Sequence, residues 1–349
     1  MRIGTRGSAL ALAQARHVAD RLEVVRPGGV EIVTITTSGD RGSGEDKSRW
    51  VDTIEQALRA GEIDLAVHSA KDVPAELAEG LSLLGAPARA DARDALCGTP
   101  GLGAPGLGAP GLGATGRGTG LDALPVGARV GTSSVRRAAQ LRAAREDLRV
   151  VAIGGNVDTR LRRLGESRER DLAATGELGE HRRGDGGTAP GELDEGPLDA
   201  IVLAHAGLQR LGREREVGAV LDPAHFVPAP GQGVLALEGR GGDGGVEEAV
   251  RAITDADAFA CLQAERAVAS GLDASCHTPL GAYAAPAGCG CLNLRAWVGL
   301  PDGSEWTSDE LLGGFYDPEA LGRRVAERLK AAGAEELLRR AEEMAVEHA

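Results

Sequence analysis

A buried strand that runs straight into four polar side chains is the first place where this sequence could do chemistry. The segment IDLAVHSAKDVP, residues 63–74, ends its apolar run at His68, Ser69, Lys71 and Asp72. In open α/β sheets, ligands bind beyond the carboxyl ends of the strands, so this position favours a binding or catalytic site. The ammonium group of Lys71 would hold Asp72 in its ionised form. An ordinary salt bridge in a loop is the other interpretation, and the residues leave both open.

A second polar cluster joins hydroxyl groups to paired arginines. In VGTSSVRRAAQ, residues 130–140, a short strand passes through Ser134 into a helix whose first turn carries Arg136 and Arg137. Free N–H groups at a helix N-terminus bind anions, whereas cations placed there oppose the helix dipole. The pair therefore predicts a site for carboxylates or phosphates, with a solvated helix face as the alternative. No glycine-rich phosphate-binding fingerprint follows a strand, which favours carboxylates.

The same arrangement of groups occurs at two other places. TRGSALA, residues 5–11, puts Arg6 and Ser8 between a strand and a helix, and GGNVDTRL adds Arg160. Two α/β units thus present anion-binding groups at their strand ends. A cleft between the two units would accommodate an elongated polyanion.

Cys276 lies in GLDASCHTPLG, a turn-forming stretch that places its thiol on a loop. Three interpretations stay open: a packed or incidental thiol, a nucleophile helped by His277, and a metal ligand acting with His277, Cys289 and Cys291. Adjacent residues rarely form a Cys–His dyad, because such a dyad needs contact in space. Cys289 and Cys291 lack the C-x₂-C spacing that is typical of zinc sites. We therefore expect no metal site.

The elements that must position these residues follow from short apolar runs that alternate with helical patterns. The expected strands cover residues 1–5, 30–37, 63–69, 128–134, 148–153, 281–287 and 291–299. The expected helices cover residues 8–23, with Ser8 as N-cap, 50–61, closed by Gly61, 134–147 and 158–166. Residues 198–212 add a strand and a helix, and residues 226–240 a turn and a strand. This alternation predicts parallel sheets with helices on both faces.

The pattern divides the chain into three domains and two insertions. The expected domains are residues 1–97 together with 228–250, residues 121–227, and a smaller third domain of residues 251–349 that carries the Cys276 loop. Residues 98–120 repeat Gly-Leu-Gly-Ala-Pro and predict a flexible linker or loop insertion. Residues 165–197 are polar and Gly-rich, and predict a mobile surface excursion.

Composition excludes several classes of function. The net charge is −13, which argues against nucleic acid as the main partner, since phosphate binding needs a basic surface. No stretch reaches about 18 uninterrupted apolar residues, so we expect no membrane span. The chain has an odd number of cysteines and no export signal. We therefore expect a cytoplasmic location and no disulfides.

Seven motifs together resemble those of one known family. They are TRGSALALAQA, DLAVHSAKDVP, VGTSSVRRAAQL, GGNVDTRL, LAHAGLQRLG, PAPGQGVLALEGR and ASCHTPLGAYA. In this order, from residue 3 to about residue 285, they resemble the porphobilinogen deaminase (hydroxymethylbilane synthase) family. No one of them alone would be sufficient.

The resemblance implies a fold and an activity. The fold is α/β, with two periplasmic-binding-protein-like, doubly wound lobes around a cleft and a smaller α+β C-terminal domain. The activity is that of a transferase of tetrapyrrole (haem) biosynthesis, which condenses four molecules of porphobilinogen into hydroxymethylbilane and releases ammonia. A dipyrromethane cofactor, attached to Cys276 through a thioether, anchors the growing chain. A cytoplasmic monomer is expected.

The resemblance also implies roles for individual residues. Asp72 matches the catalytic aspartate. The residues that would bind the carboxylates of the cofactor are Lys71, Ser134, Arg136 and Arg137, and those that would bind the substrate are Arg6, Ser8, Arg160, Arg210 and Lys47. Arginine forks suit such carboxylates, and Lys47 would lie on a loop over the cleft.

Some residues depart from the family pattern. Gly154 stands where many members have an arginine, KSRW at residues 47–50 replaces Lys-Gly-hydrophobe-Phe, and Ala9 replaces a proline. One carboxylate contact is therefore missing or supplied from elsewhere, and the loop that carries Lys47 differs from the family pattern. The rival hypothesis is a non-catalytic, two-lobed binding protein for organic polyanions, which explains the arginines but not Cys276.

Overall fold

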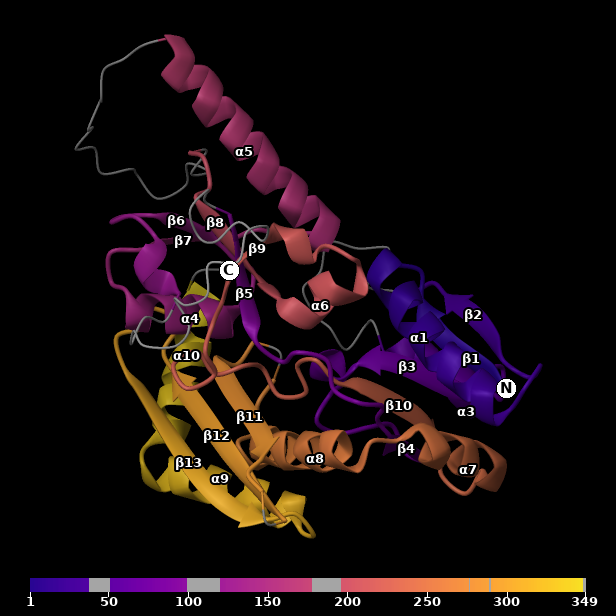
Figure 1. The fold of residues 1–349 in the computed structure, drawn as a ribbon. Coiled ribbons are helices and arrows are strands. Elements are labelled where there is room, and N and C mark those ends of the chain that lie inside the picture. The colour runs from indigo at the N-terminus through magenta and orange to yellow at the C-terminus, as the bar shows by residue number, and fades with distance from the viewer. Residues whose placement is uncertain (38–50, 99–119, 178–195, 276, 289, 348–349) are drawn as a thin grey trace.

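The computed structural model describes residues 1–37, 51–98, 120–177, 196–275, 277–288 and 290–347. Its described strands form two five-stranded sheets and one three-stranded sheet, each covered by helices (Figure 1). Lys47, Cys276 and most of the 98–120 insertion lie outside the described residues. Among the described helices, none is both long and apolar enough to cross a bilayer.

The first lobe is built on a sheet with the order β2-β1-β3-β10-β4. Its strands are β1 (Arg2–Arg6), β2 (Glu31–Ile35), β3 (Leu65–Ser69), β4 (Leu81–Gly85) and β10 (Leu235–Arg240), and its helices are α1 (Ala9–Val25), α3 (Asp52–Arg59) and α7 (Gly244–Ile253). Successive side chains of a strand point to opposite faces. Leu65 and Val67 therefore join α1 and α7 in one apolar core, while Ala66 joins α3 in another. Helices cover both faces, as the doubly wound prediction requires.

The second lobe repeats this plan with the order β7-β6-β8-β5-β9. Its strands are β5 (Asp94–Gly98), β6 (Arg129–Gly131), β7 (Arg149–Val151), β8 (Ala200–Ala204) and β9 (Val217–Val220), and its helices are α4 (Val135–Ala144), α5 (Val157–Glu177) and α6 (His205–Arg210). Short 3₁₀ helices cover η3 (Leu121–Ala123) and η4 (Glu214–Glu216). Val202 packs with Leu141 of α4, and Ile201 packs with Leu161 of α5 on the opposite face.

The prediction of parallel sheets is correct for β2, β1 and β3 and for β7, β6 and β8, but each sheet also contains one reversed strand. In the first sheet β10 runs antiparallel to β3 and β4, and in the second β5 runs antiparallel to β8 and β9. Each reversed strand is the first one after the chain changes lobe. The first crossing comes between Gly85 and Asp94, earlier than the expected boundary at residue 97, because β5 already belongs to the second sheet.

The third domain packs helices on one side of an antiparallel sheet. Its elements are α8 (Ala256–Gly271), β11 (Leu280–Pro286), β12 (Cys291–Gly299), β13 (Trp306–Gly314), α9 (Pro318–Ala331) and α10 (Ala334–Glu347). All six contribute to one apolar core. Sequence patterns predicted two of the strands and missed β13, because WTSDELLGG mixes polar and small residues with few β-branched ones.

The predicted excursion at residues 165–197 is wrong for its first part, since α5 continues to Glu177. The segment is rich in Arg, Glu, Leu and Ala, which favour helix. An Arg162–Glu166 pair at i,i+4 adds local support. As a result α5 projects well beyond the sheet (Figure 1). Residues 178–195 lie outside the described part of the chain.

Candidate active site at the strand ends of the two lobes

Asp72 lies on a short 3₁₀ turn, η2 (Ala70–Asp72), that directly follows β3. Two contacts hold this turn in place. The Ala70 amide donates to the Val234 carbonyl at 3.0 Å, and Val73 is buried in the apolar cluster that contains Leu262. Lys71 and Asp72 themselves are half-buried. The strand thus brings both charged groups to the carboxyl edge of the first sheet, as the sequence predicted.

Helix α1 brings a second set of groups to the same edge. Arg6 ends β1, which runs parallel to β3 and next to it. Ser8 caps α1 by accepting from the Ala11 amide at 3.2 Å, which confirms the predicted cap. Gln14 of α1 donates to the Ser69 hydroxyl at 2.7 Å and so ties the helix to the Asp72 turn.

Arg160 brings the second lobe to this site. Its guanidinium donates to the Ser133 hydroxyl at 2.7 Å and to the Gly155 carbonyl at 2.8 Å. Burial lowers the pKa of Arg160 to about 10, and the charges of Arg137 and Arg163 act in the same direction, whereas Asp72 opposes them. The charge of Asp72, in the first lobe, is the weakest of these four influences on the Arg160 guanidinium of the second lobe.

Arg136 and Arg137 lie deeper than a solvated helix face, since they are only 4% and 5% exposed. Ser134 caps α4 through the Arg137 amide, as predicted. The two side chains hold the buried Asp94 between them, each with a nitrogen 2.8 Å from one of its oxygens. Arg136 also donates to the Val227 carbonyl at 2.6 Å, while its Nε has no acceptor among the described residues.

Asp94 and Gln232 are the residues of this cluster that sequence reasoning missed. The Gln232 side chain donates to Asp94 at 2.9 Å and to the Ala92 carbonyl at 2.7 Å. Desolvation by burial would raise the pKa of Asp94, but the charges of Arg136 and Arg137 outweigh it and lower the pKa. The sequence contains one indication of this buried acid, which is that Asp94 stands at the start of the apolar strand DALCG.

Arg210 lies at the place where the chain crosses between lobes. It donates to the Gly233 carbonyl at 2.7 Å, and burial lowers its pKa to about 10. Its charge also lowers the pKa of His17 on α1, after the larger effects of burial and Arg21. The side chain therefore lies between α6 and the first lobe.

Cys276 itself is not among the described residues, but its flanking segments are. The loop joins the end of α8 at Gly271 to the start of β11, and the Ser275 amide donates to the Thr278 hydroxyl at 2.8 Å. His277 is exposed. The thiols of Cys97 and Cys261 are buried, which raises the pKa of each to about 12, so neither is a reactive thiolate.

The zinc interpretation joins residues from opposite ends of one strand. His277 precedes the start of β11, and Cys291 follows its far end. β11 has seven residues, which span about 20 Å at ~3.3 Å per residue. Zinc ligands bind at about 2.0–2.3 Å, so these two side chains cannot share one ion in this arrangement. Within the described ranges, no group of three or more His, Cys, Asp or Glu side chains could hold a metal.

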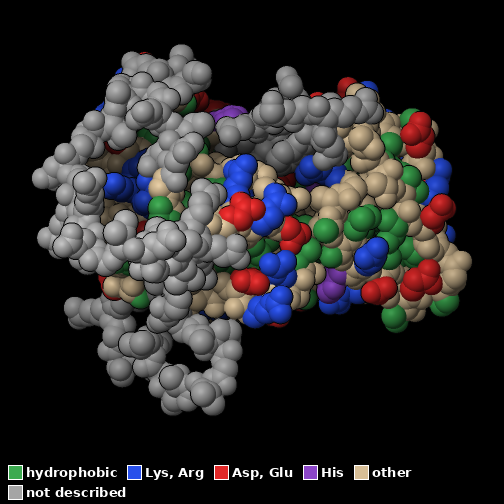
Figure 2. Space-filling view, turned by 90° about the horizontal axis from the view of Figure 1, so that it is seen from above, with side chains coloured by type: hydrophobic (Ala, Val, Ile, Leu, Met, Phe, Trp, Pro, Cys, Tyr) green, Lys and Arg blue, Asp and Glu red, His purple; other side chains and the backbone are tan. Residues whose placement is uncertain are grey.

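Charged side chains of both signs gather near the middle of the face seen in Figure 2, beside residues drawn in grey.

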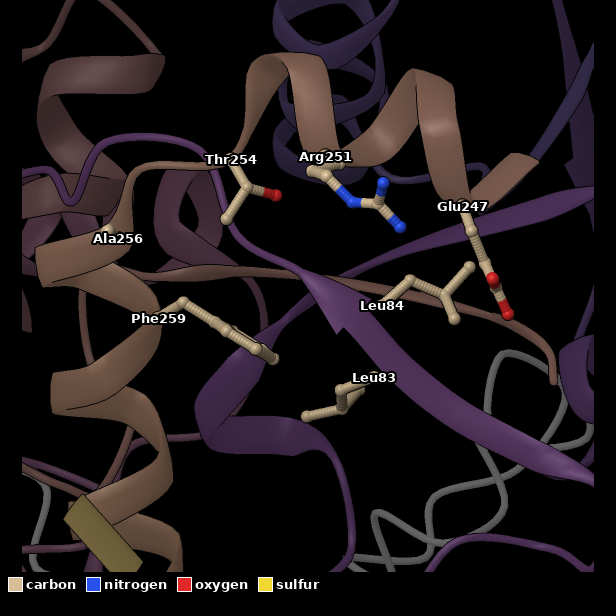
Figure 3. Close-up of a pocket in the computed structure, with 7 residues that line it drawn as sticks. All are labelled: Leu83, Leu84, Glu247, Arg251, Thr254, Ala256 and Phe259. Carbon is tan, nitrogen blue, oxygen red and sulfur yellow. The ribbon is translucent and has the colours of Figure 1, made fainter. Parts of the chain in front are cut away.

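A pocket of about 530 Å³ lies between β4, α7 and the start of α8 (Figure 3). Its lining is half apolar, and Glu247 and Arg251 reach its rim from α7. None of the predicted site residues that the structure describes lines this pocket.

Comparisons with known proteins agree over nearly the whole chain. The family model described as "Porphobilinogen deaminase, dipyromethane cofactor binding domain" matches residues 1–248, and "Porphobilinogen deaminase, C-terminal domain" matches residues 259–331. The porphobilinogen deaminase of Roseiflexus castenholzii is 40% identical over 343 residues, which cover 96% of this chain and 97% of that protein. The porphobilinogen deaminase of Stenotrophomonas maltophilia is 39% identical over 97% of this chain and 98% of its own length. That of Deinococcus radiodurans is also 39% identical, over 96% of this chain and 97% of its own length.

Among solved structures, the similarities are more distant. The methionine binding protein MetQ aligns with a TM-score of 0.39 and 13% identity over 72% of this chain and 89% of its own. Immunogenic lipoprotein A from Vibrio vulnificus aligns with a TM-score of 0.38 and 12% identity over 74% of this chain and 96% of its own. Likeness at this level has no bearing on function.

Proposed function

The chain belongs to the porphobilinogen deaminase family, and from this premise we propose that it condenses four porphobilinogen molecules into hydroxymethylbilane, with Asp72 as its acid–base group and Cys276 as the anchor of its dipyrromethane cofactor. The observation that carries the proposal is that Asp72 and Arg6 follow or end two neighbouring parallel strands, β3 and β1, and that Gln14 of α1 is bonded to Ser69 beside the Asp72 turn at 2.7 Å. It brings a carboxylate and a carboxylate-binding guanidinium to one place.

This pairing suits the reaction. Loss of ammonia from porphobilinogen leaves a cationic electrophile, and joining that carbon to the next pyrrole releases a proton. An ionised Asp72 can stabilise the positive charge electrostatically and accept the proton.

The described residues fit a cofactor that carries several carboxylates. When bound, the dipyrromethane supplies the terminal pyrrole carbon to which the first substrate is joined. Arg137 and Arg163 lower the pKa of Arg160, and an added anion would relieve this repulsion. The residues that would hold the cofactor are Lys71, Ser134, Arg136 and Arg137, and Arg6, Ser8, Arg160, Arg210 and Lys47 would bind the substrate. Arg136 and Arg137 would do so while they also hold Asp94.

We expect Asp72→Asn to lower kcat by about 10²–10⁴-fold, because the amide can neither accept the proton nor balance the cation. The measurement is steady-state turnover of porphobilinogen by the purified holoenzyme. Asp158→Asn serves as a matched control, since Asp158 is half-exposed at the start of α5 and pairs with Arg213. Turnover of Asp72→Asn within about tenfold of the wild type would rule out the role given to this residue.

We expect the purified wild-type chain to be heavier than its sequence by one covalently bound dipyrromethane, and Cys276→Ala to have the mass of its sequence alone. Intact mass spectrometry measures both. Cys291→Ala is the control, because it removes a half-buried thiol of the same domain and should keep the added mass. An unmodified wild-type chain, or an added mass on Cys276→Ala, would contradict the proposed anchor.

We also propose that the enzyme works as a monomer in the cytoplasm. Among the described residues, one chain supplies Lys71, Asp72 and Arg6 at one edge of the first sheet, which supports a site formed within a single copy. The buried thiols of Cys97 and Cys261, which form no disulfide, suit a reducing compartment. Sedimentation of the purified holoenzyme at its working concentration measures the oligomeric state.

A further inference from the structure

Helix α8 of the third domain connects the Asp72 turn to the Cys276 loop. Three backbone carbonyls that follow Asp72 all accept hydrogen bonds from one side chain, Arg266. Its Nη1 lies 3.3 Å from the Val73 oxygen, and its Nη2 lies 2.7 Å from the Pro74 oxygen and 2.8 Å from the Ala75 oxygen. The helix ends at Gly271, and the loop with Cys276 begins there.

Packing holds the same two elements together. Leu262, one turn before Arg266 on α8, is fully buried in the apolar cluster that contains Ala70 and Val73 of the turn. Gly231 lies between them with a φ of +72°, and a Cβ at this position would be 2.9 Å from Ala70 and 3.1 Å from Leu262. Turn, crossing segment and helix are therefore in contact without intervening space.

Electrostatics support a fixed guanidinium at this position. Burial lowers the pKa of Arg266, and the charge of Glu238 opposes that shift. Glu238 is fully buried in β10, and its carboxylate lies 3.0 Å from His68 of β3. A negative charge on the sheet beneath the turn thus favours the charged form of Arg266.

The adjacent residue, Glu265, fixes α8 to the rest of the molecule. Its carboxylate is completely buried and accepts from Arg89 at 2.6 Å and from the amides of Gly231 and Ala284 at 2.7 Å. Glu265 and Arg266 are consecutive residues of α8 that bind different segments. Glu265 binds the two segments that cross between the lobes, and Arg266 binds residues 73–75 of the first lobe. Glu265 already secures the docking of the domain, so the contacts of Arg266 are directed specifically at the turn.

We propose that Arg266 is a positioning residue for the condensation: it fixes the Asp72 turn to the helix that leads to the Cys276 loop, so that the carboxylate keeps its place relative to the anchored chain. The inference rests on the proposed roles of Asp72 and Cys276. Arg266 itself acts only through the backbone of residues 73–75.

The test uses full-length holoenzyme with Arg266→Met, which removes all donors and keeps most of the apolar stem, and Arg266→Lys, which keeps one charged donor group. Arg328→Met is the matched control, because Arg328 is an exposed arginine of the same domain whose side chain binds Asp309 within the described part of the chain. Intact mass reports the loading of each variant, and rates are expressed per loaded molecule. Thermal unfolding is followed in parallel.

We expect Arg266→Met to lower kcat by about 10- to 100-fold with KM within about threefold, because small displacements of a catalytic group have effects of this size. Arg266→Lys should recover only part of the loss, because one ammonium group cannot replace two guanidinium nitrogens that bind three carbonyls, and Arg328→Met should match the wild type. In an Asp72→Asn background, Arg266→Met should have little further effect on kcat, since the two changes act on one group.

Unchanged kcat per loaded molecule in Arg266→Met, with only a lower unfolding temperature, would overturn the proposal. So would an Arg266→Met effect of equal size with and without Asp72→Asn. If Arg266→Met cannot be loaded or does not fold, Arg266→Lys decides, and wild-type kcat in that variant together with a lower unfolding temperature refutes positioning. Full activity of Asp72→Asn, by contrast, would refute the proposed function itself.

Discussion

At the scale of single residues, the arginines of the VRR motif have an internal partner before any ligand arrives. Asp94 is 42 and 43 residues away in sequence and completely buried between Arg136 and Arg137. The local sequence predicted that Arg136 and Arg137 would bind an anion. It could not predict that Asp94 is their partner, because that pairing depends on how β5 lies beside α4 and β8. The cluster gives fixed positions to side chains that are otherwise flexible.

We expect Asp94→Asn to lower the free energy of unfolding by about 3–5 kcal/mol, because it leaves two buried guanidinium groups without their counter-charge. Urea unfolding of wild type and variant at pH 7 measures this difference. Asp309→Asn is the control, since its partner Arg328 is largely exposed, and it should have a far smaller effect. Equal effects of the two substitutions would contradict the importance given to burial.

The sign of the pH dependence follows from the lowered pKa of Asp94. A carboxyl whose pKa is lower in the folded state stabilises the fold above the unfolded pKa of about 3.9, and this contribution is lost as the pH falls through the folded value. The difference between wild type and Asp94→Asn should therefore be full at neutral pH and shrink only below about pH 4.

At the scale of elements, the segment 227–234 that returns to the first lobe depends on a close backbone approach. Gly233 has a φ of +87°, and a Cβ there would lie 2.5 Å from the Ala90 oxygen of the other crossing segment. Its own carbonyl accepts from the Ala90 amide and from Arg210. The two crossings are therefore bonded to each other and to α6.

We expect Gly233→Ala to lower the free energy of unfolding by about 2–4 kcal/mol, through backbone strain and the contact with Ala90 together. Gly242→Ala is the matched control: its φ is +83°, but nothing lies within 4 Å of its Cβ position. It should show only the backbone part, about 1–2 kcal/mol. Urea unfolding of both variants gives the difference, and a Gly233→Ala value no larger than the control would contradict the steric argument.

Local signals predicted most elements but not how strands pair. Ser8 and Ser134 cap their helices as expected, because a cap depends on residues only a few positions apart. The reversed directions of β5 and β10 could not be read from the sequence, since an apolar run has the same composition in either direction. The motif with Asp72 follows the end of β3 as expected, whereas Arg160 lies inside α5. The depth of Arg136 and Arg137 depends on Asp94 of β5 and on Val227 of the crossing segment.

At the scale of the whole molecule, three domains meet around the crossings. Glu265 of the third domain binds Arg89 of one crossing and the Gly231 amide of the other, and Gln232 joins the second crossing to Asp94. Arg142 of α4 adds a direct bond to the Pro301 carbonyl in the third domain. The division into two lobes and a smaller domain was predictable from the sequence, but these buried junctions were not.

Because β10 of the first sheet follows the whole second lobe in the sequence, the two sheets cannot be completed at the same time during synthesis on the ribosome. Every strand of the second sheet is encoded between Asp94 and Val220, so that sheet can close as soon as this stretch has emerged. The first sheet cannot, because β4 pairs only through β10, which is translated after the entire second lobe. The N-terminal lobe is thus the later of the two to be completed, and until β10 is made its sheet has an open edge at β3.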